Sequence, residues 1–192
     1  DAVEERARSV VATTTTGVTV RAAWVVYATG YELARSIAAP NHSIHSTWAM
    51  ATPPQRAKLW PTQCMIWEAS ERYLYLRTTS DGRIIIGGED EPFADEAHRD
   101  ALTDSKIKTL QKKLQLMFPD VDTTADYHWA GSFGGSDTGT PSIGRVPGKG
   151  RTLALLGFGG NGITFSMLGA QILRGIVSGE ADPDEDLFAL KP

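Results

Sequence analysis

The 192-residue chain has a single cysteine, no long apolar run and no excess of basic residues. One cysteine, Cys64, excludes a disulfide within the chain and is typical of proteins from a reducing compartment. No apolar stretch approaches the ~20 residues that a membrane-spanning helix needs. A formal net charge of −4 offers no basic surface to nucleic acid. We therefore expect a cytoplasmic protein that has neither nucleic acid nor a membrane as its partner.

The chain also lacks an initiating methionine and the hydrophobic core of a signal peptide. It opens with Asp1–Arg6 and continues directly into strand-like sequence, which we interpret as a piece of a longer polypeptide. The four histidines show no metal-ligand spacing, so we expect no metal site. Hydrophobic residues make up 41% of the chain and charged residues 22%, which predicts a packed core. Cys64 lies in the apolar run Cys64–Trp67, and we predict that it is buried there.

The most specific motif is a glycine-rich turn between a predicted strand, residues 152–156, and a predicted helix, residues 163–177. The turn reads Gly157-Phe158-Gly159-Gly160-Asn161-Gly162. Glycines let a ligand approach the backbone, and the amides and dipole of a first helical turn favour a negative or electron-rich group. The motif therefore predicts a cofactor cradle. A glycine-rich turn that binds no ligand is the alternative.

The same turn fits the dinucleotide-binding pattern G-x-G-x-x-G in letters but not in context. That fingerprint requires a second strand after the helix, ending in an acidic residue that holds a ribose hydroxyl. Here the helix is followed by Ser178-Gly179-Glu180 and an acidic tail that contains proline. We interpret the motif as opening the last helix of a nucleotide-cofactor enzyme rather than its first.

The remaining pattern predicts an α+β fold in three segments. Residues 1–42 contain predicted strands 10–16, 18–20 and 23–27, the last of them apolar on both faces as in a buried α/β sheet. Residues 43–140 contain strands 43–51, 63–68, 73–78, 83–88 and 127–133, a turn at Asp81-Gly82, and a helix over 95–118. The loop 134–147 leads to the final strand and helix of segment 141–192.

The predicted helix over residues 95–118 is amphipathic. Its inward residues recur at helical spacing and are Ile107, Leu110, Leu114 and Met117. Its solvent-facing residues are lysines, at positions 106, 108, 112 and 113. An antiparallel sheet with one such helix is suited to covering a ligand, so the central segment is predicted to bind the substrate and the two end segments the cofactor.

Four motifs in this order resemble those of FAD-dependent oxidoreductases of the D-amino-acid oxidase / glycine oxidase superfamily. They are the strand Val25–Tyr31, the hairpin Tyr73–Arg77 with Asp81–Asp90, the segment Trp129–Gly131 with Asp137 and Pro141–Gly144, and the flavin-contact segment Gly157–Thr164. The resemblance covers nearly the whole chain. It lacks that family's N-terminal strand–GxGxxG–helix unit, which grips the ADP portion of FAD.

The resemblance implies an FAD site. The implied cofactor-binding residues are Thr29, Gly30, Gly157, Phe158, Gly159, Gly160, Asn161, Gly162, Ile163 and Thr164, and the amides from Gly160 to Ile163 would face the flavin pyrimidine ring. Sarcosine oxidases of this superfamily attach FAD through a cysteine in the segment that corresponds to residues 134–142, which has none here. The resemblance therefore implies noncovalent FAD.

The resemblance also implies hydride transfer from an amine or amino-acid C–H bond to the flavin, with no protein nucleophile. Glycine-oxidase-like members carry substrate-clamping arginines where this chain has Ser132–Gly134 and Gly160, which favours an amine over a simple α-amino acid. Candidate substrate residues are Tyr73, Tyr75, Arg77, His128 and Phe133, with Arg83 as a further replacement arginine.

Three readings of the chain stay open at this point. The first is the C-terminal part of a flavin-dependent amine or amino-acid oxidoreductase, inactive without its N-terminal half. The second is a non-catalytic binding module derived from such an enzyme. The third is one chain of a flavin site split between two chains. A homodimer is an expected assembly if the missing half leaves a large apolar surface.

Overall fold

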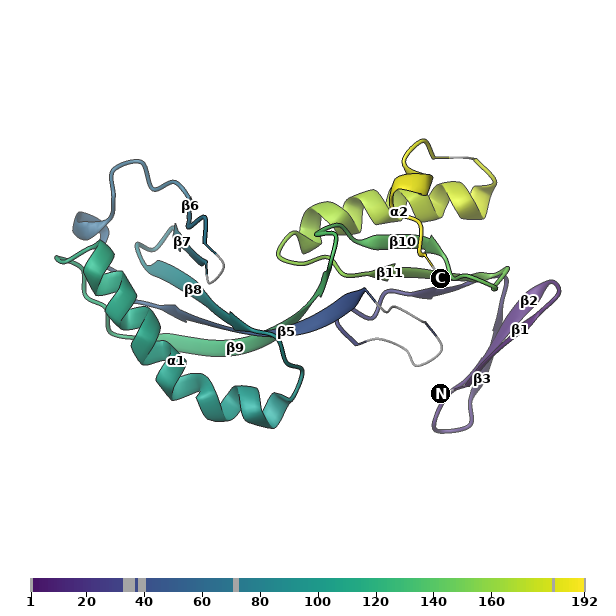
Figure 1. Ribbon diagram of the computed structural model, residues 1–192, viewed down its shortest axis with the longest axis horizontal. Helices are drawn as coiled ribbons and strands as arrows, with labels where there is room; N and C mark the ends of the chain where they lie inside the picture. The colour runs from purple at the N-terminus through teal and green to yellow at the C-terminus, as the bar shows by residue number, and fades with distance from the viewer. Residues whose placement is uncertain (1, 33–36, 38–40, 71–72, 181, 192) are drawn as a thin grey trace. The chain divides into compact units, whose positions relative to one another are not determined.

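A computed structural model describes residues 2–32, 37, 41–70, 73–180 and 182–191 (Figure 1). These residues form two compact units. The terminal unit combines Asp1–Ser43 with Phe133–Pro192, and the central unit is Ile44–Ser132. The predicted first segment, 1–42, includes positions 33–36 and 38–40, which lie outside the described residues. The mixed α+β architecture that the sequence predicts is confirmed.

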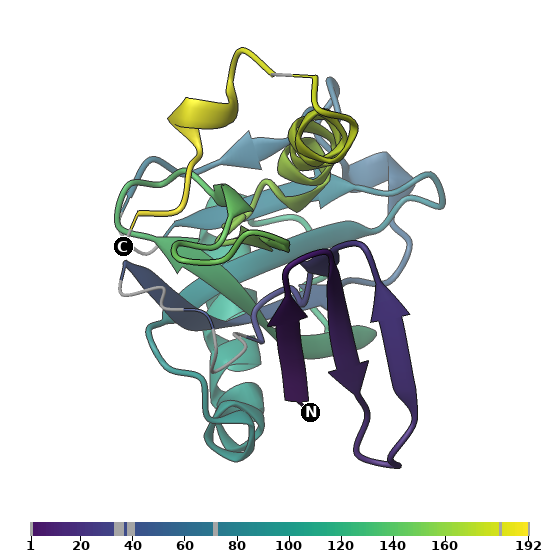
Figure 2. The same cartoon turned by 90° about the vertical axis from the view of Figure 1, so that its right-hand side faces the viewer.

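The terminal unit contains two three-stranded sheets. Strands β1 (Ala2–Arg6), β2 (Ser9–Thr13) and β3 (Thr19–Ala22) form an antiparallel meander, which Figure 2 shows in purple. The second sheet has the order β10 (Ser142–Arg145), β11 (Thr152–Leu156), β4 (Val25–Tyr27). In it β10 and β11 are antiparallel, whereas β11 and β4 are parallel.

Helix α2 (Gly162–Ser178) packs on this second sheet. Ile172 and Ile176 of the helix are buried against Ile143, Leu153 and Leu155 of the strands. The approach is close, because a Cβ atom added at Gly169 would lie 2.6 Å from the Leu155 side chain. The helix ends at Gly179, whose φ of 77° is the left-handed conformation that glycine adopts most readily at a C-terminus.

The central unit is a five-stranded sheet covered on one face by helix α1 (Glu96–Met117) (Figure 1). Its strand order is β6 (Ile66–Trp67), β7 (Leu74–Thr78), β8 (Ile84–Glu91), β5 (His42–Ala51), β9 (Tyr127–Ser136). A short 3-10 turn, Arg56–Lys58, lies in the connection between β5 and β6, and a second, Glu185–Leu187, lies in the C-terminal segment.

The core of the central unit lies between the sheet and α1. Alternate residues of each strand point to this side, as a strand period of two requires. The core consists of Trp48, Met50, Leu74, Leu76, Ile84, Ile86, Ile107, Leu110, Leu114 and Val121. Asp95 caps α1, because its carboxylate accepts a hydrogen bond of 2.8 Å from the backbone N–H of His98.

Several details differ from the sequence-based expectation. Strands β1 and β10 were not predicted, because AVEER and SIGR have too few apolar residues to show a strand period. The prediction that the strand of residues 23–27 is buried on both faces is wrong, since Val26 of β4 is 44% exposed. Cys64 is exposed, not buried, and Met65 beside it is 61% exposed. The short β6 leaves this apolar run at the surface.

The predicted pattern on α1 was wrong at Met117, which was expected inward but is 42% exposed near the end of the helix, and at one of the lysines. Lys106, predicted to face solvent, is buried, and its ammonium group lies 2.5 Å from a carboxylate oxygen of Glu91. It also donates to the backbone carbonyl of Glu89 at 3.0 Å and lies over the ring of Trp48. Lys113 forms a second ion pair, with the buried Glu89 carboxylate. The two lysines therefore join α1 to β8.

The Lys106 contacts predict a large loss of stability on truncation. Lys106→Ala should lower the free energy of unfolding by about 2–4 kcal/mol, because it leaves the partly exposed Glu91 without its cation and the buried Glu89 with Lys113 alone. Lys112→Ala, on an exposed position of the same helix, should change it by less than about 0.5 kcal/mol. Urea unfolding followed by circular dichroism measures both. Equal effects of the two variants would contradict a stabilising role for Lys106.

Candidate cofactor cradle and substrate face

The parallel pairing of β4 with β11 positions the candidate cofactor site. Val25 lies opposite Thr152 and Tyr27 opposite Ala154, so the two strands run in the same direction and end at the same edge. The residues that follow β4 include Thr29 and Gly30, and those that follow β11 form the glycine-rich turn. The carboxyl edge of a parallel sheet is where ligands bind in open α/β folds. Two motifs far apart in the sequence are thereby brought to one edge.

The glycine-rich turn uses part of its backbone internally. Gly159 donates its N–H to the carbonyl of Gly134 at 2.8 Å, and Asn161 donates to the carbonyl of Phe158 at 3.2 Å. These two amides are therefore already paired, and the expectation that the Asn161 amide faces a flavin is not supported. Phe158 packs against the apolar cluster of Ile143 and α2, so its side chain belongs to the core.

The N-terminus of α2 has no side-chain cap. The side chain of Asn161 makes no capping hydrogen bond, and the carbonyl of Asn161 accepts the N–H of Phe165 at 3.1 Å. The amides of Gly162, Ile163 and Thr164 precede that bond and so have no acceptor within the helix. Ile163 is 93% exposed, which leaves this first turn open to a ligand. By contrast, α1 begins with the capping carboxylate of Asp95.

Space for a ligand is present beside this first turn. A Cβ atom added at Gly159, Gly160 or Gly162 would have no other atom within 4 Å. Gly30, at the end of β4, is equally open and has a φ of 68°. Thr29 donates its hydroxyl to the carbonyl of Glu32, so its side chain orders the turn after β4. Open glycines at an uncapped helix N-terminus fit the electron-rich edge of a flavin ring.

A partly open cavity in the same unit is too small to be the cofactor site. Its volume is about 80 Å³, and its lining residues are Asn41, His42, Ser136, Thr138, Thr140, Pro141, Ser142 and residues 187–191. Ligand pockets for small molecules and cofactors are several times larger. The candidate site is therefore the open edge of the sheet, not this cavity.

Gly157 is the one glycine of the motif at which an added side chain would meet another residue. Its φ of 73° is left-handed, and an added Cβ would lie 2.5 Å from Cδ2 of His42. No sequence pattern pointed to His42 at this site, because its contact with Gly157 depends on the approach of two distant segments, in which the N–H of Asp137 donates to the carbonyl of Asn41 at 3.0 Å.

The contrast between the two ends of the turn is testable by alanine substitution. Gly157→Ala should destabilise the protein by at least about 1–2 kcal/mol, because the left-handed conformation alone costs a side chain that much. Gly162→Ala should change stability by less than about 1 kcal/mol, because it adds a methyl group to open space in a helix. Thermal unfolding of the two variants measures the difference, and an equal loss in both would contradict the described turn.

His42 also predicts a pH dependence of stability. Both ring nitrogens are buried, and burial lowers the pKa of His42 below its ordinary value of 6.5. The folded state therefore holds this ring neutral, whereas the unfolded chain takes up a proton near pH 6.5. The stabilising contribution is present above about pH 6.5 and is lost as the pH falls below that value.

Urea unfolding at pH 7.5 and pH 5.5 tests this dependence. The loss of stability between the two values should be smaller in His42→Gln than in the unaltered protein. The control is His128→Gln, which changes an exposed ring and should keep the full loss. A full loss in His42→Gln would assign the pH dependence to other groups.

The candidate substrate residues of the central unit divide between the two faces of its sheet. Tyr73 and Tyr75 share the face opposite α1, with their ring centroids 6.4 Å apart. Trp67, paired with Tyr75 across the strands, joins them, and its ring lies 5.4 Å from that of Tyr73. Arg77, two residues farther along β7 from Tyr75, is exposed. The sequence offered Trp67 only as one of four tryptophans that could serve as a cation–π partner, because its pairing with Tyr75 depends on the register of β6 and β7.

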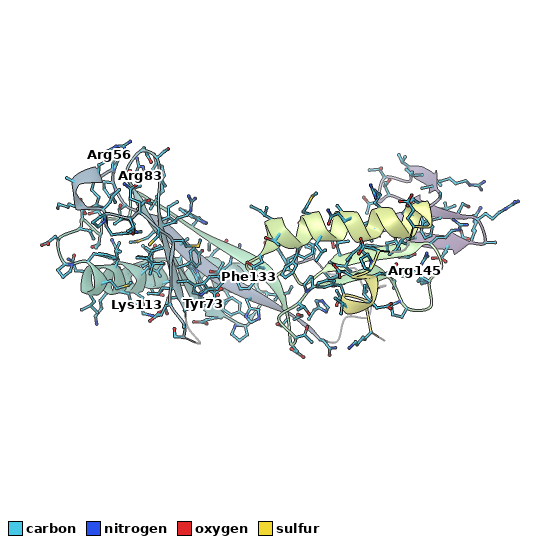
Figure 3. All side chains as sticks on the ribbon, turned by 90° about the horizontal axis from the view of Figure 1, so that it is seen from above. Arg56, Tyr73, Arg83, Lys113, Phe133 and Arg145 are labelled. Carbon is cyan, nitrogen blue, oxygen red and sulfur yellow. The ribbon has the colours of Figure 1, made fainter. Side chains whose placement is uncertain are left out.

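Other candidate residues lie elsewhere. His128 is exposed and shares its sheet face with Ala130, which packs on the core beneath α1, so His128 lies on the face opposite the two tyrosines. Arg83 is engaged by Asp81 and Asp126 and donates to the carbonyl of Thr52 at 3.0 Å. Figure 3 shows Arg83 near Arg56, apart from Tyr73.

Phe133 is half-buried at the start of the second segment of the terminal unit. The neighbouring Ser132 is bound by a residue of α1, because Arg99 donates a hydrogen bond of 2.8 Å to its hydroxyl.

No group of three metal-ligating side chains occurs among the described residues. None of the described helices is both long and apolar enough to span a membrane.

Comparison with known proteins assigns the family. The model of the family described as DAO, FAD dependent oxidoreductase, matches residues 1–175. The chain therefore belongs to the DAO family of FAD-dependent oxidoreductases. No curated protein sequence matches the chain.

The fold is similar to those of several solved structures. Glycine oxidase from Geobacillus kaustophilus aligns over 98% of this chain and 50% of its own, with a TM-score of 0.78 and 19% identity. Iminodiacetate oxidase from Chelativorans sp. BNC1 aligns over 98% of this chain and 51% of its own, with a TM-score of 0.77 and 17% identity. L-Proline dehydrogenase from P. horikoshii aligns over 98% of this chain and 52% of its own, with a TM-score of 0.74 and 18% identity. The chain thus spans about half the length of the solved structures it matches.

Proposed function

We propose that this chain is the C-terminal part of an FAD-dependent oxidoreductase that oxidises the C–N bond of an amine or amino acid. The observation that carries the proposal is the open, uncapped N-terminus of α2 beside the carboxyl end of the parallel strand β4. Membership of an FAD-dependent family supports the choice of cofactor. The terminal unit would hold the flavin and the central unit the substrate.

The residues of the cradle have distinct roles in this proposal. The free amides of Gly162, Ile163 and Thr164, with the dipole of α2, would stabilise the electron-rich edge of the flavin by about 0.3–2 kcal/mol. Gly160 and Gly30 leave room for the ring, while Gly157 and Gly159 fix the course of the turn. FAD, when bound, supplies the acceptor for a hydride from the substrate carbon.

Two features refine the cofactor and substrate. Residues 134–142 contain no cysteine, which supports noncovalent FAD. The position after Gly131 is Ser132, whose hydroxyl accepts from Arg99 of α1, so no arginine clamp extends from this point of the chain. We therefore favour an amine without a simple α-carboxylate.

The partial coverage of the solved structures supports a proposal about the rest of the protein. The chain covers only half of each solved structure reported above. The other half in this protein would be an N-terminal segment that grips the ADP portion of FAD. The isolated chain is then expected to bind FAD weakly or not at all.

The full-length protein tests the proposal. As purified, or after addition of FAD, it should show the visible absorption of a bound flavin. Gly162→Val should weaken FAD binding by at least about tenfold, equal to about 1.4 kcal/mol, because the side chain enters the open cradle. The matched control is Ala170→Val, which adds the same side chain at an exposed position of α2. Flavin fluorescence titration measures the affinity, and circular dichroism confirms that α2 is retained.

Two results would contradict the proposal. A full-length protein that takes up no FAD would reject the flavin site altogether. Equal FAD affinity in Gly162→Val and Ala170→Val would remove the first turn of α2 from the site.

A further inference from the structure

The sheet face opposite α1 in the central unit carries a group of aromatic rings. We name it the aromatic face and define it by Trp67, Tyr73 and Tyr75, whose adjacent ring centroids are 5.4 and 6.4 Å apart. Tyr75 lies flat across β8, because an added Cβ at Gly87 would be 2.3 Å from its hydroxyl oxygen. Trp67 is 57% exposed, so the rings are accessible from solvent within this unit.

A β-bulge places a carboxylate beside these rings. Gly88 has a φ of 135° and Glu89 a φ of 60°, and the pairing between β8 and β5 shifts register near this point. The bulge directs Glu89 toward the lysines of α1, as its ion pair with Lys113 shows. The next residue, Asp90, consequently lies on the aromatic face, close enough to Tyr73 for its carboxylate to raise the pKa of that phenol.

The Asp90 carboxylate is incompletely satisfied. Its Oδ1 atom is buried and has no hydrogen-bond partner among the described residues. The nearby lysines, Lys106 and Lys113, are paired with Glu89 and Glu91 on the helix side of the sheet. Within the described part of the chain, no ion pair includes Asp90. A buried carboxylate oxygen without a partner is costly, and a bound donor would remove that cost.

Among the described residues, Asp90 and Arg77 are the charged groups that act on the rings of the aromatic face. Burial and the Asp90 carboxylate raise the pKa of Tyr73, and burial followed by Asp90 raises the pKa of Tyr75. Both phenols are therefore neutral at physiological pH. Arg77 is the cation that acts on Tyr75 from the same strand, and it lies at an exposed position. The aromatic face thus has the Asp90 carboxylate acting on both tyrosines and the Arg77 guanidinium acting on Tyr75.

We propose that Asp90 and the aromatic face bind a protonated amine. The ammonium group donates a charge-assisted hydrogen bond to Oδ1 of Asp90 and lies against the rings of Trp67 and Tyr73. Aromatic faces attract cations through their quadrupole, and a carboxylate adds a directed acceptor. Asp90 is then a residue that determines specificity. It does not take part in the chemical step.

This inference rests on the proposed function and narrows its substrate class. Hydride transfer from an amine carbon requires a lone pair on the reacting nitrogen. The nitrogen held by Asp90 stays protonated, so it is a second nitrogen of the substrate. The substrate class is therefore a diamine or polyamine derivative that carries a cationic group apart from the oxidised C–N bond.

The test uses two probes that share a tert-butyl group and carry opposite charges. tert-Butylammonium has no hydrogen on the carbon next to nitrogen and cannot be oxidised by hydride transfer, and pivalate is its carboxylate counterpart. Isothermal titration of the full-length protein should show tighter binding of tert-butylammonium, by at least tenfold. Asp90→Asn should reduce its affinity about tenfold, and Trp67→Leu several-fold.

Two further variants complete the design. Asp104→Asn makes the same chemical change at an exposed position of α1 and should leave the affinity unaltered. Asp90→Glu keeps the charge and should keep the preference for the cation, which separates loss of charge from disturbed folding. Circular dichroism of each variant checks the fold.

Tighter binding of pivalate would overturn the inference and assign an anion site to Arg77. Unchanged affinity in Asp90→Asn would overturn it as well. Asp90-dependent binding of tert-butylammonium by a full-length protein that takes up no FAD would reject the proposed oxidoreductase, while the ammonium site would stand.

Discussion

The parallel pairing of β4 with β11 is the interaction on which the candidate cofactor site depends. Residues more than one hundred positions apart meet there, in a register that opposes Val25 to Thr152. The strand β11 is buried at each of its five residues, so its position is fixed by apolar packing from α2. The same packing sets the direction in which the first turn of α2 points. The open edge is therefore a product of the core beneath it.

The central unit uses its two sheet faces for different purposes. One face is filled by apolar side chains from α1 and carries the Lys106 ion pairs that join helix and strand. The other face bears the rings of Trp67 and Tyr73 and the carboxylate of Asp90. A single bulge at Gly88 and Glu89 separates the two roles, because it changes which side chains of β8 face which way.

Much of this arrangement could be predicted from the sequence, for clear physical reasons. The apolar strand that became β11, the long helix α1 and the glycine-rich turn have strong local signals, and the structure has all three. Resemblance to a flavoenzyme superfamily was confirmed by the family match. The roles of individual cradle and substrate residues stay predictions.

The parts that could not be predicted depend on contacts between distant residues. Lys106 fits the solvent face by helical spacing, yet it is buried because Glu89 and Glu91 lie opposite on β8. Asp90 reaches the aromatic face only through the bulge, and a strict period of two would place it differently. The amide of Asn161 is consumed by a local turn that the motif does not encode.

The exposed edge of β4 has a practical consequence for handling this polypeptide. Among the described strands, β4 is the last in its sheet, and Val26 is 44% exposed there. The edge of a sheet is where an extended segment of another chain can add a strand. We therefore expect the chain produced by itself to aggregate through strand addition at β4. Co-expression with a polypeptide that pairs with this edge should increase the monodisperse fraction.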